Sequence, residues 1–299
     1  MENKQGAESN TFTIHPNAHI GHLHLRVTNI ESSLRYYRDL LGFQTVGEKS
    51  AEKAFLTVDS TQPYLLALSR TSEPRTSEKH AGLYHFAILL PNRKSLASLL
   101  RHLMKHIQES NLEGAADHGV SEAIYLQDPD GNGVEIYSDR PRSEWQWSEG
   151  QVQMTTKGLD EQGLLKEAKE NWIGTPRGTK IGHVHLHVSN LSAAERFYRG
   201  CLGFKLNASI PSAHFYAADD YHHHVATNTW LGEGVSPASK TQPGLDHFAL
   251  VLPNEEALHH LFRNLSWKAV STEKSEEKEF LHSVYVYDPD GIKIELHTG

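Results

Sequence analysis

Residues 20–43 read IGHLHLRVTNIESSLRYYRDLLGF, and residues 181–204 read IGHVHLHVSNLSAAERFYRGCLGF. Further along, GLYHFAILLPN from Gly82 matches GLDHFALVLPN from Gly244, and YLQDPDGNGVEIY from Tyr125 matches YVYDPDGIKIELH from Tyr285. The offset stays at about 160 residues, which is too long for a solenoid repeat and indicates one domain duplicated once. We therefore expect a polar N-terminal tail at 1–17, a first domain at 18–140, a structured linker at 141–180 and a second domain at 181–299.

Each copy shows the same order of expected elements. HLHLRV and HVHLHV alternate with period two and predict half-buried strands, and the residues that follow them have helical spacing up to Gly42 or Gly203. A second strand and helix come next, and a hairpin with a DPDG turn closes the copy. The sequence thus predicts an α+β fold with curved mixed sheets.

Composition excludes several classes of protein. The chain has 299 residues, of which 38% are apolar and 22% charged, so it can build packed cores. A net charge of −8 without a basic run argues against nucleic acid as a partner, and the longest apolar stretches are too short to span a membrane. The first residues lack the apolar core of a signal peptide, and Cys201 is the single cysteine, so we expect a cytoplasmic protein. The sequence leaves open whether the protein forms homo-oligomers.

The chain contains 21 histidines, and strand alternation predicts where several of them point. In the second copy, His183, His247 and Glu295 alternate with apolar residues and share the face opposite the helices. Two histidines and one carboxylate are the facial set that suits non-haem Fe(II), although Mn(II), Co(II) or Zn(II) would fit almost equally. The first copy repeats the pattern with His22, His85 and Glu135, as an alternative or second site.

These residues carry a resemblance to a known family. The chain from about Ile20 onward resembles the vicinal oxygen chelate superfamily and, more narrowly, its catechol 2,3-dioxygenase-like extradiol ring-cleaving enzymes. The specific pieces are HVHLHV, GLDHFALVLP, YHHHVATNTW and DHGVSEAIYLQDPDGNGVEIYSDRP. The resemblance implies two tandem domains, each a pair of βαβββ modules around a metal cavity, and iron held by His183, His247 and Glu295.

The same resemblance implies further active-site residues. It places a substrate-binding tyrosine at Tyr285, with Tyr125 in the first domain, and a proton-transferring histidine at His223, with His224 as the alternative. His118 lies where these enzymes carry another histidine, whereas the second domain offers only His282 in that stretch. Neither domain matches every family position, and His223 together with the usual family arrangement favours the second.

The expected activity is therefore Fe(II)-dependent cleavage of a catechol-type aromatic diol by O2 to a semialdehyde. One rival is a metal-dependent isomerase or thiol transferase of the same superfamily. Those enzymes resemble each other in that a glutamate on the fourth strand serves as an additional metal ligand. The corresponding stretches here, PYLLALSR (63–70) and HHHVATNTW (222–230), contain no glutamate. The other rival is a metal-free binding or resistance protein. The fold and the ligand set do not define which diol is bound.

Overall fold

The computed structural model describes residues 12–47, 50–59, 64–274 and 283–299. It contains four similar units of a strand, helical segments and further strands, which we call modules 1 to 4 (residues 19–70, 80–139, 180–228 and 244–298). Most of the expected N-terminal tail lies outside the described residues. Among the described helices, none combines the length and the apolar character that a membrane crossing requires.

The elements of the first repeat follow the expected order. Module 1 contains β1 (His19–Val27), α1 (Ile30–Leu34), η1 (Arg35–Leu40), β2 (Gln44–Val46), β3 (Lys53–Thr57) and β4 (Leu66–Arg70). Module 2 contains β5 (His80–Leu89), α2 (Arg93–Lys105), α3 (Ile107–Ser110), β6 (Leu112–Asp117), β7 (Ser121–Gln127) and β8 (Gly133–Asp139).

The linker and the second repeat complete the chain. The linker carries η2 (Arg142–Glu144), β9 (Trp147–Ser148), β10 (Gln151–Val152), β11 (Lys157–Gly158) and α4 (Glu161–Leu165). Module 3 contains β12 (Lys180–His187), α5 (Leu191–Tyr198), β13 (Lys205–Ile210), β14 (Ala213–Ala217) and β15 (Val225–Asn228), after which comes β16 (Ser236–Pro237). Module 4 contains β17 (Gly244–Leu252), α6 (Glu255–Trp267), β18 (Glu273–Lys274), β19 (Val284–Tyr287) and β20 (Lys293–Thr298).

An asparagine begins the first helix of every module. The side-chain oxygen of each one accepts a hydrogen bond from the backbone N–H three residues later, which satisfies a donor that the helix leaves unpaired. These N-caps are Asn29, Asn92, Asn190 and Asn254. At the other end of the first helical segment of each repeat, Gly42 and Gly203 have φ values of +89° and +81°. Glycine adopts this left-handed conformation without strain, as the sequence predicts.

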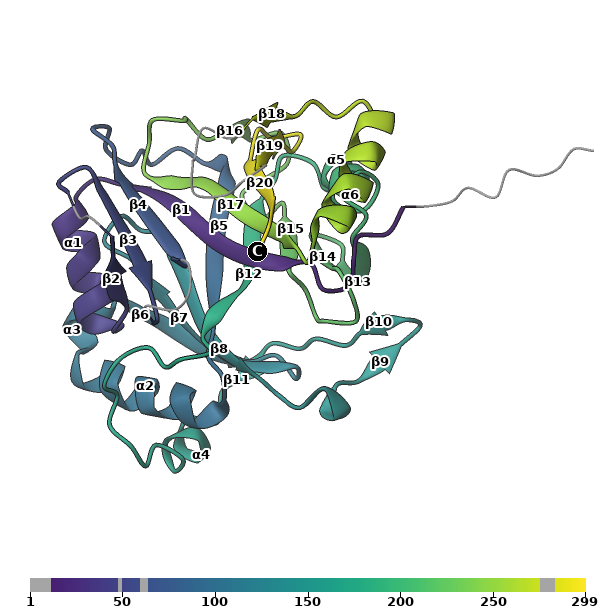
Figure 1. Ribbon diagram of the computed structural model, residues 1–299. Helices are drawn as coiled ribbons and strands as arrows, with labels where there is room; N and C mark the ends of the chain where they lie inside the picture. The colour runs from purple at the N-terminus through teal and green to yellow at the C-terminus, as the bar shows by residue number, and fades with distance from the viewer. Residues whose placement is uncertain (1–11, 48–49, 60–63, 275–282) are drawn as a thin grey trace, which may run out of the picture.

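Apart from the two-stranded pair of β9 and β10, the described strands form two large mixed sheets (Figure 1). The first sheet has the order β18-β19-β20-β17-β1-β4-β3-β2. The second has the order β11-β6-β7-β8-β5-β12-β15-β14-β13, with β16 beside β5. The mixed sheets and the α+β class agree with the expectation. Side chains on the helix-facing side, such as Leu23, Leu25 and Val184, are fully buried in one core.

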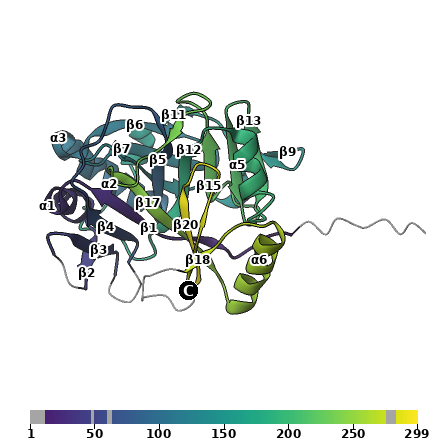
Figure 2. The same ribbon diagram turned by 90° about the horizontal axis from the view of Figure 1, so that it is seen from above.

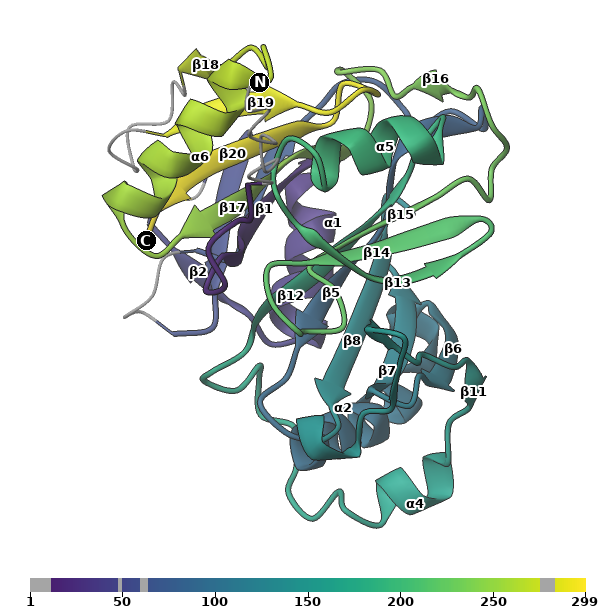
Figure 3. The same cartoon turned by 90° about the vertical axis from the view of Figure 1, so that its right-hand side faces the viewer.

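The pairing of the modules differs from the expectation that each repeat closes its own sheet. β1 pairs antiparallel with β17, which joins module 1 to module 4, and β12 pairs antiparallel with β5, which joins module 3 to module 2. Figure 3 shows β1 beside β17 in one sheet and β12 beside β5 in the other. Each sheet therefore combines strands from both repeats, and the division at residues 140 and 181 does not separate the two sheets.

Contacts outside the sheets hold the modules of one repeat together. The Tyr37 hydroxyl donates a hydrogen bond of 2.7 Å to Asp128 in the DPDG turn of module 2, and Tyr198 donates one of 3.0 Å to Asp288 in module 4. The linker helix α4 is short, and the linker contacts module 2. Arg93 of α2 forms ion pairs with Glu122 and with the linker residue Glu167. Figure 2 shows β9 projecting at the edge of the molecule, and β10 of the same hairpin contacts β13.

Candidate metal centres

The register of three neighbouring strands in the second sheet brings two histidines and a glutamate together. On β12, His183 lies opposite Ala87 of β5, and Ala87 lies opposite Glu135 of β8. His85 points to the same face as Ala87 because side chains alternate along a strand. The small Ala87 leaves space above it for the longer side chains. We call His85, Glu135 and His183 the second-sheet triad.

The second-sheet triad is compact and buried. Glu135 Oε2 lies 3.0 Å from His85 Nε2 and 3.2 Å from His183 Nε2. The three residues are between 2% and 6% exposed. Burial raises the pKa of Glu135, but the adjacent His183 and His85 outweigh it and hold the pKa well below its ordinary value. Burial lowers the pKa of His183 to about 4 despite the neighbouring carboxylate. At neutral pH the triad therefore presents a carboxylate and a neutral His183.

The predicted proton-transfer histidine, His223, lies against this triad. Its ring centroid is 4.1 Å from that of His183, and its Nδ1 is 2.8 Å from His222 Nδ1. His222 Nε2 is in turn 3.2 Å from the Asp139 carboxylate. Burial, together with the neighbouring His183 and other histidines, holds the pKa of His223 well below 6.5. His223 is thus a neutral base at physiological pH, held by a buried neighbour.

Tyr125 and His118 reach the same triad from the other side. Tyr125 of β7 lies opposite Glu135 of β8, and its hydroxyl is 2.6 Å from His118 Nε2. His118 Nδ1 is 2.8 Å from the Thr155 carbonyl oxygen, an acceptor, so Nδ1 carries the proton and Nε2 accepts from Tyr125. The tyrosine hydroxyl is therefore held in a fixed orientation beside the triad.

A pocket opens onto this site. It has a volume of about 320 Å³, and His85, Tyr125, Tyr84 and His187 are among its lining residues. The Tyr84 ring lies 4.8 Å from the His187 ring and 5.2 Å from that of Trp230, so aromatic side chains line one side of the approach. Charged side chains, among them Arg75 and Lys79, also line the pocket, and its volume suits a small molecule next to the triad.

A second cluster of the same composition lies in the first sheet. There Ala249 of β17 lies opposite Glu295 of β20, and His247 is two residues before Ala249. Glu295 Oε2 is 3.2 Å from His22 Nε2 and 3.7 Å from His247 Nε2. We call His22, His247 and Glu295 the first-sheet triad; its members are between 0% and 2% exposed.

The first-sheet triad has different neighbours. Tyr285 lies opposite Glu295, as Tyr125 lies opposite Glu135. The Tyr64 hydroxyl, however, lies 3.5 Å from His22 Nε2, on the side where His223 approaches His183 in the other sheet. The fourth strand here, β4, has the sequence LALSR and carries no histidine. His282, the predicted counterpart of His118, lies outside the described residues.

The structure groups the predicted ligands differently from the expectation. His183 does not join His247 and Glu295, and His22 does not join His85 and Glu135; the two histidines exchange places because β1 and β12 each pair with the other repeat. The exchange explains why neither repeat alone matches every family position. His223 from the second repeat, with His118 and Tyr125 from the first, surrounds one triad. His224 does not face it: its Nδ1 accepts a hydrogen bond from the Ala218 amide, 3.2 Å away.

The sequence analysis did not identify three residues that lie next to the histidines of the two sites. His222 and Asp139 lie behind His223, and Asp246 contacts His247 with an oxygen 2.8 Å from Nδ1. Asp246 was detectable, because GLDHF carries an aspartate where GLYHF has Tyr84. The contact between His222 and Asp139 could not be predicted from the sequence, because these residues are 83 positions apart.

Both triads have the chemistry of a metal site. In each one, two imidazole nitrogens and a carboxylate oxygen lie within 4.8 Å of one another. Imidazole and carboxylate are ligands of divalent transition metals, and three ligands on one side leave coordination positions open for other molecules. The donor atoms present in each triad therefore fit one divalent ion.

Known proteins share both the sequence and the fold. The chain is 42% identical over 282 residues to Catechol-2,3-dioxygenase of Bacillus subtilis (strain 168), covering 93% of this chain and 96% of the relative. A crystal structure of another protein from Bacillus subtilis subsp. subtilis str. 168 aligns with a TM-score of 0.65 at 12% identity, over 96% of this chain and 86% of that one. The crystal structure of glyoxalase I from Zea mays aligns with a TM-score of 0.55 at 16% identity, over 94% of this chain and 92% of that one.

The family model matches both repeats, at residues 19–136 and 180–296. These ranges follow the duplicated sequence and include every member of both triads. The extent of the match and the two-repeat fold show that the chain belongs to the Glyoxalase/Bleomycin resistance protein/Dioxygenase superfamily.

Proposed function

We propose that the protein is an Fe(II)-dependent extradiol dioxygenase that opens a catechol-type ring with O2 at the second-sheet triad. The observation that carries the proposal is the convergence of His223, His118 and Tyr125 on His85, Glu135 and His183. The relative named Catechol-2,3-dioxygenase, at 42% identity over nearly the whole chain, supports the same activity.

His85, His183 and Glu135 would hold the metal. Bound Fe(II) would supply coordination of the two substrate oxygens and of O2 and a route for electrons between them. The pocket lined by Tyr84 and Tyr125 also includes His85 of the triad, so a substrate in this pocket would lie next to the bound metal. Aromatic side chains at the approach favour a flat ring over a polar chain.

His223 and Tyr125 would handle the protons of the diol. A neutral imidazole at His223 can accept a proton from a ring hydroxyl and return it later in the reaction. The Tyr125 hydroxyl, which donates to His118, can accept a hydrogen bond from a substrate hydroxyl group and orient the ring. The two groups lie on opposite sides of the triad, which suits a substrate with two neighbouring oxygens.

The test is anaerobic reconstitution of the metal-free chain with Fe(II), followed by air and a panel of catechols. We expect O2 uptake matched by a coloured ring-fission product with at least one of them. Glu135→Gln should abolish turnover, while the matched variant Glu295→Gln, in the other triad, should retain it. Absence of O2 uptake with every catechol would reject the proposal.

The same preparations test the rivals and the choice of metal. Reconstitution with Mn(II), Co(II) or Zn(II) in place of Fe(II) shows which ion supports ring opening. A chain that takes up no metal yet binds aromatic ligands would instead be a binding protein. Turnover of an α-keto thiol adduct without O2 uptake would indicate an isomerase.

A further inference from the structure

The base assigned above, His223, lies at one end of a hydrogen-bond network. Its Nδ1 is 2.8 Å from Nδ1 of His222, and Nε2 of His222 is 3.2 Å from Oδ1 of Asp139. We propose that Asp139 and His222 are positioning residues that fix the tautomer of His223, with its proton on Nδ1 and the lone pair of Nε2 free to act as the base. The catalytic consequence rests on the proposed dioxygenase activity, whereas the tautomer itself does not.

The carboxylate sets the direction of each hydrogen bond that follows it. A carboxylate only accepts, so Nε2 of His222 carries a proton towards Asp139. A neutral imidazole has a single N–H, and Nδ1 of His222 is therefore an acceptor. The proton between the two facing Nδ1 atoms belongs to His223. A neutral His223 then has no proton on Nε2, which is what a general base requires.

Asp139 is itself held in place by two tyrosines. The oxygen that contacts His222 also accepts a hydrogen bond of 3.2 Å from the Tyr221 hydroxyl. Because Tyr221 donates to Asp139, the Tyr137 hydroxyl, 2.7 Å away, donates to Tyr221. The Tyr221 ring also lies 4.1 Å from the ring of His222. Donors thus point to Asp139 from both sides, and the network has one consistent set of directions.

The first sheet differs at both ends of this network. Tyr64 takes the place of His223 there, beside the histidine of β1. The offset of the repeat places Gly299, which has no side chain, at the position of Asp139. The two sheets share the His, His and Glu ligand set, so a carboxylate that served the ligands would be expected in both. Its presence only beside the base indicates that it serves the base.

Nitrogen NMR shifts of the histidine rings measure the tautomer directly and need no catechol. They distinguish a protonated ring nitrogen from an unprotonated one, and His223→Gln identifies the signals of His223. Spectra of the full-length protein, without metal and with diamagnetic Zn(II), should show the proton of His223 on Nδ1. A proton on Nε2 of His223, or a doubly protonated His222, would overturn the proposal.

Asp139→Ala removes the carboxylate at the far end of the network. The Asp139 side chain is 27% exposed, so the protein should still fold. His223 should then show a mixture of tautomers, and kcat for a catechol should fall about 10–100-fold. KM should not change, because Asp139 is not among the residues that line the pocket. Tyr221→Phe is the matched control, since it removes the other hydrogen bond to the same oxygen and should leave the tautomer of His223 unchanged.

The conservative variant Asp139→Asn separates a positioning role from a merely structural one. It keeps an oxygen that can accept from His222 and Tyr221, so it should restore the tautomer and most of kcat. A lower kcat in Asp139→Ala without a change of tautomer would contradict the assigned role. If the wild-type protein opens no catechol, the dioxygenase is rejected, and the nitrogen shifts still decide whether Asp139 fixes His223. If Asp139→Ala does not fold, the wild-type spectrum alone makes that decision.

Discussion

At the scale of single residues, the two triads are alike and their neighbours differ. Both present two imidazoles and one carboxylate, but His223 lies beside His183 whereas Tyr64 lies beside His22. A metal ligand set does not by itself define a reaction. The residues that can move protons therefore distinguish the proposed active site from the first-sheet triad.

His223→Gln tests this distinction. Removal of the base should lower kcat by about 10²–10⁴-fold, because general acid–base catalysis contributes that much. Metal content should stay unchanged, since His223 is not among His85, His183 and Glu135. Steady-state O2 uptake and elemental analysis measure the two quantities. Equal kcat in the variant and the wild-type chain would contradict the assigned role.

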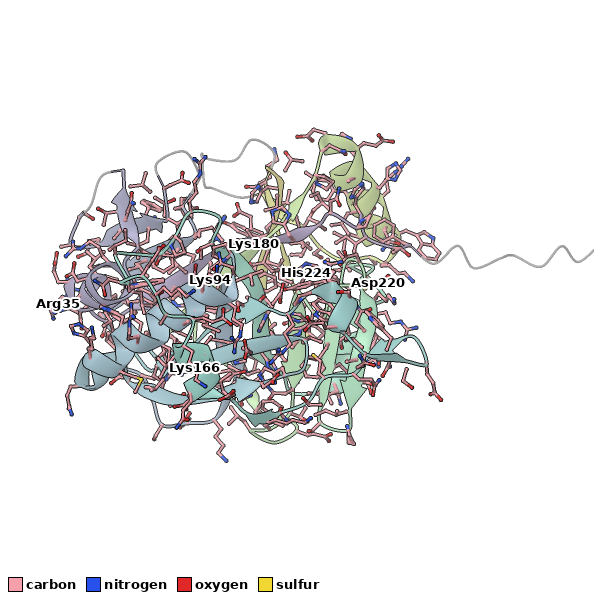
Figure 4. All side chains as sticks on the ribbon, turned by 90° about the horizontal axis from the view of Figure 1, so that it is seen from below. Arg35, Lys94, Lys166, Lys180, Asp220 and His224 are labelled. Carbon is pink, nitrogen blue, oxygen red and sulfur yellow. The ribbon has the colours of Figure 1, made fainter. Side chains whose placement is uncertain are left out.

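His224→Asn tests a pH effect on stability. His224 lies towards the middle of the molecule in Figure 4, and burial followed by nearby positive groups lowers its pKa to about 3. Between pH 6.5 and 3 the unfolded chain binds a proton that the folded chain does not, so this group reduces stability as the pH falls. The loss is at most about 1.4 kcal/mol per pH unit.

Asparagine cannot titrate, but its side-chain oxygen can still accept the Ala218 N–H. We therefore expect a shallower fall in the free energy of unfolding for His224→Asn between pH 6.5 and 4, measured by urea denaturation of the metal-free chain. Parallel pH profiles for the variant and the wild type would show that His224 is protonated in the folded state.

At the scale of elements, short signals position each module. The asparagine N-caps begin the helices, and the DPDG turns join the last two strands of each repeat. Asp128 of one turn also accepts the Tyr37 hydroxyl from the neighbouring module. The turn thus connects modules 1 and 2 although their strands lie in different sheets.

Tyr37→Phe tests this connection. Loss of a hydrogen bond to a buried carboxyl group should lower the free energy of unfolding by about 1–3 kcal/mol. Tyr36→Phe is the matched control, because no hydrogen-bond partner of its buried hydroxyl is found within the described part of the chain. Denaturant midpoints of the two variants measure the difference. A loss of the same size in both would mean that the hydroxyl of Tyr37 contributes nothing specific.

At the scale of the whole molecule, the exchange of modules between the sheets builds each site from both repeats. His183 is 48 residues beyond Glu135 and in the other repeat, yet the two side chains are 3.2 Å apart. Neither repeat contains a complete triad with its own auxiliary residues. Activity should therefore depend on ligands from both halves of the chain.

The double variant His183→Gln/Glu135→Gln tests the exchange. Both residues belong to one site, so the double variant should lose no more metal than each single variant, and each single variant should lose at least about 100-fold in activity. If each repeat closed its own site, the two substitutions would affect different sites, and the double variant would lose more metal than either single variant. Elemental analysis of the three variants separates these outcomes.

The sequence by itself determined the duplication, the strand and helix order and the face of the sheet on which each triad residue lies, because alternation and turn residues act over a few positions. His22, His85, Glu135, His183, His247 and Glu295 all point where that pattern predicts. Only the tertiary structure decided which of them meet. The strands that begin IGHLHL and IGHVHL are nearly identical, so either could pair with β5 or with β17. The local sequence pattern therefore does not predict which pairing forms. Packing of the whole chain makes that choice, and with it decides that His183 and His223 share one site with Glu135 and Tyr125.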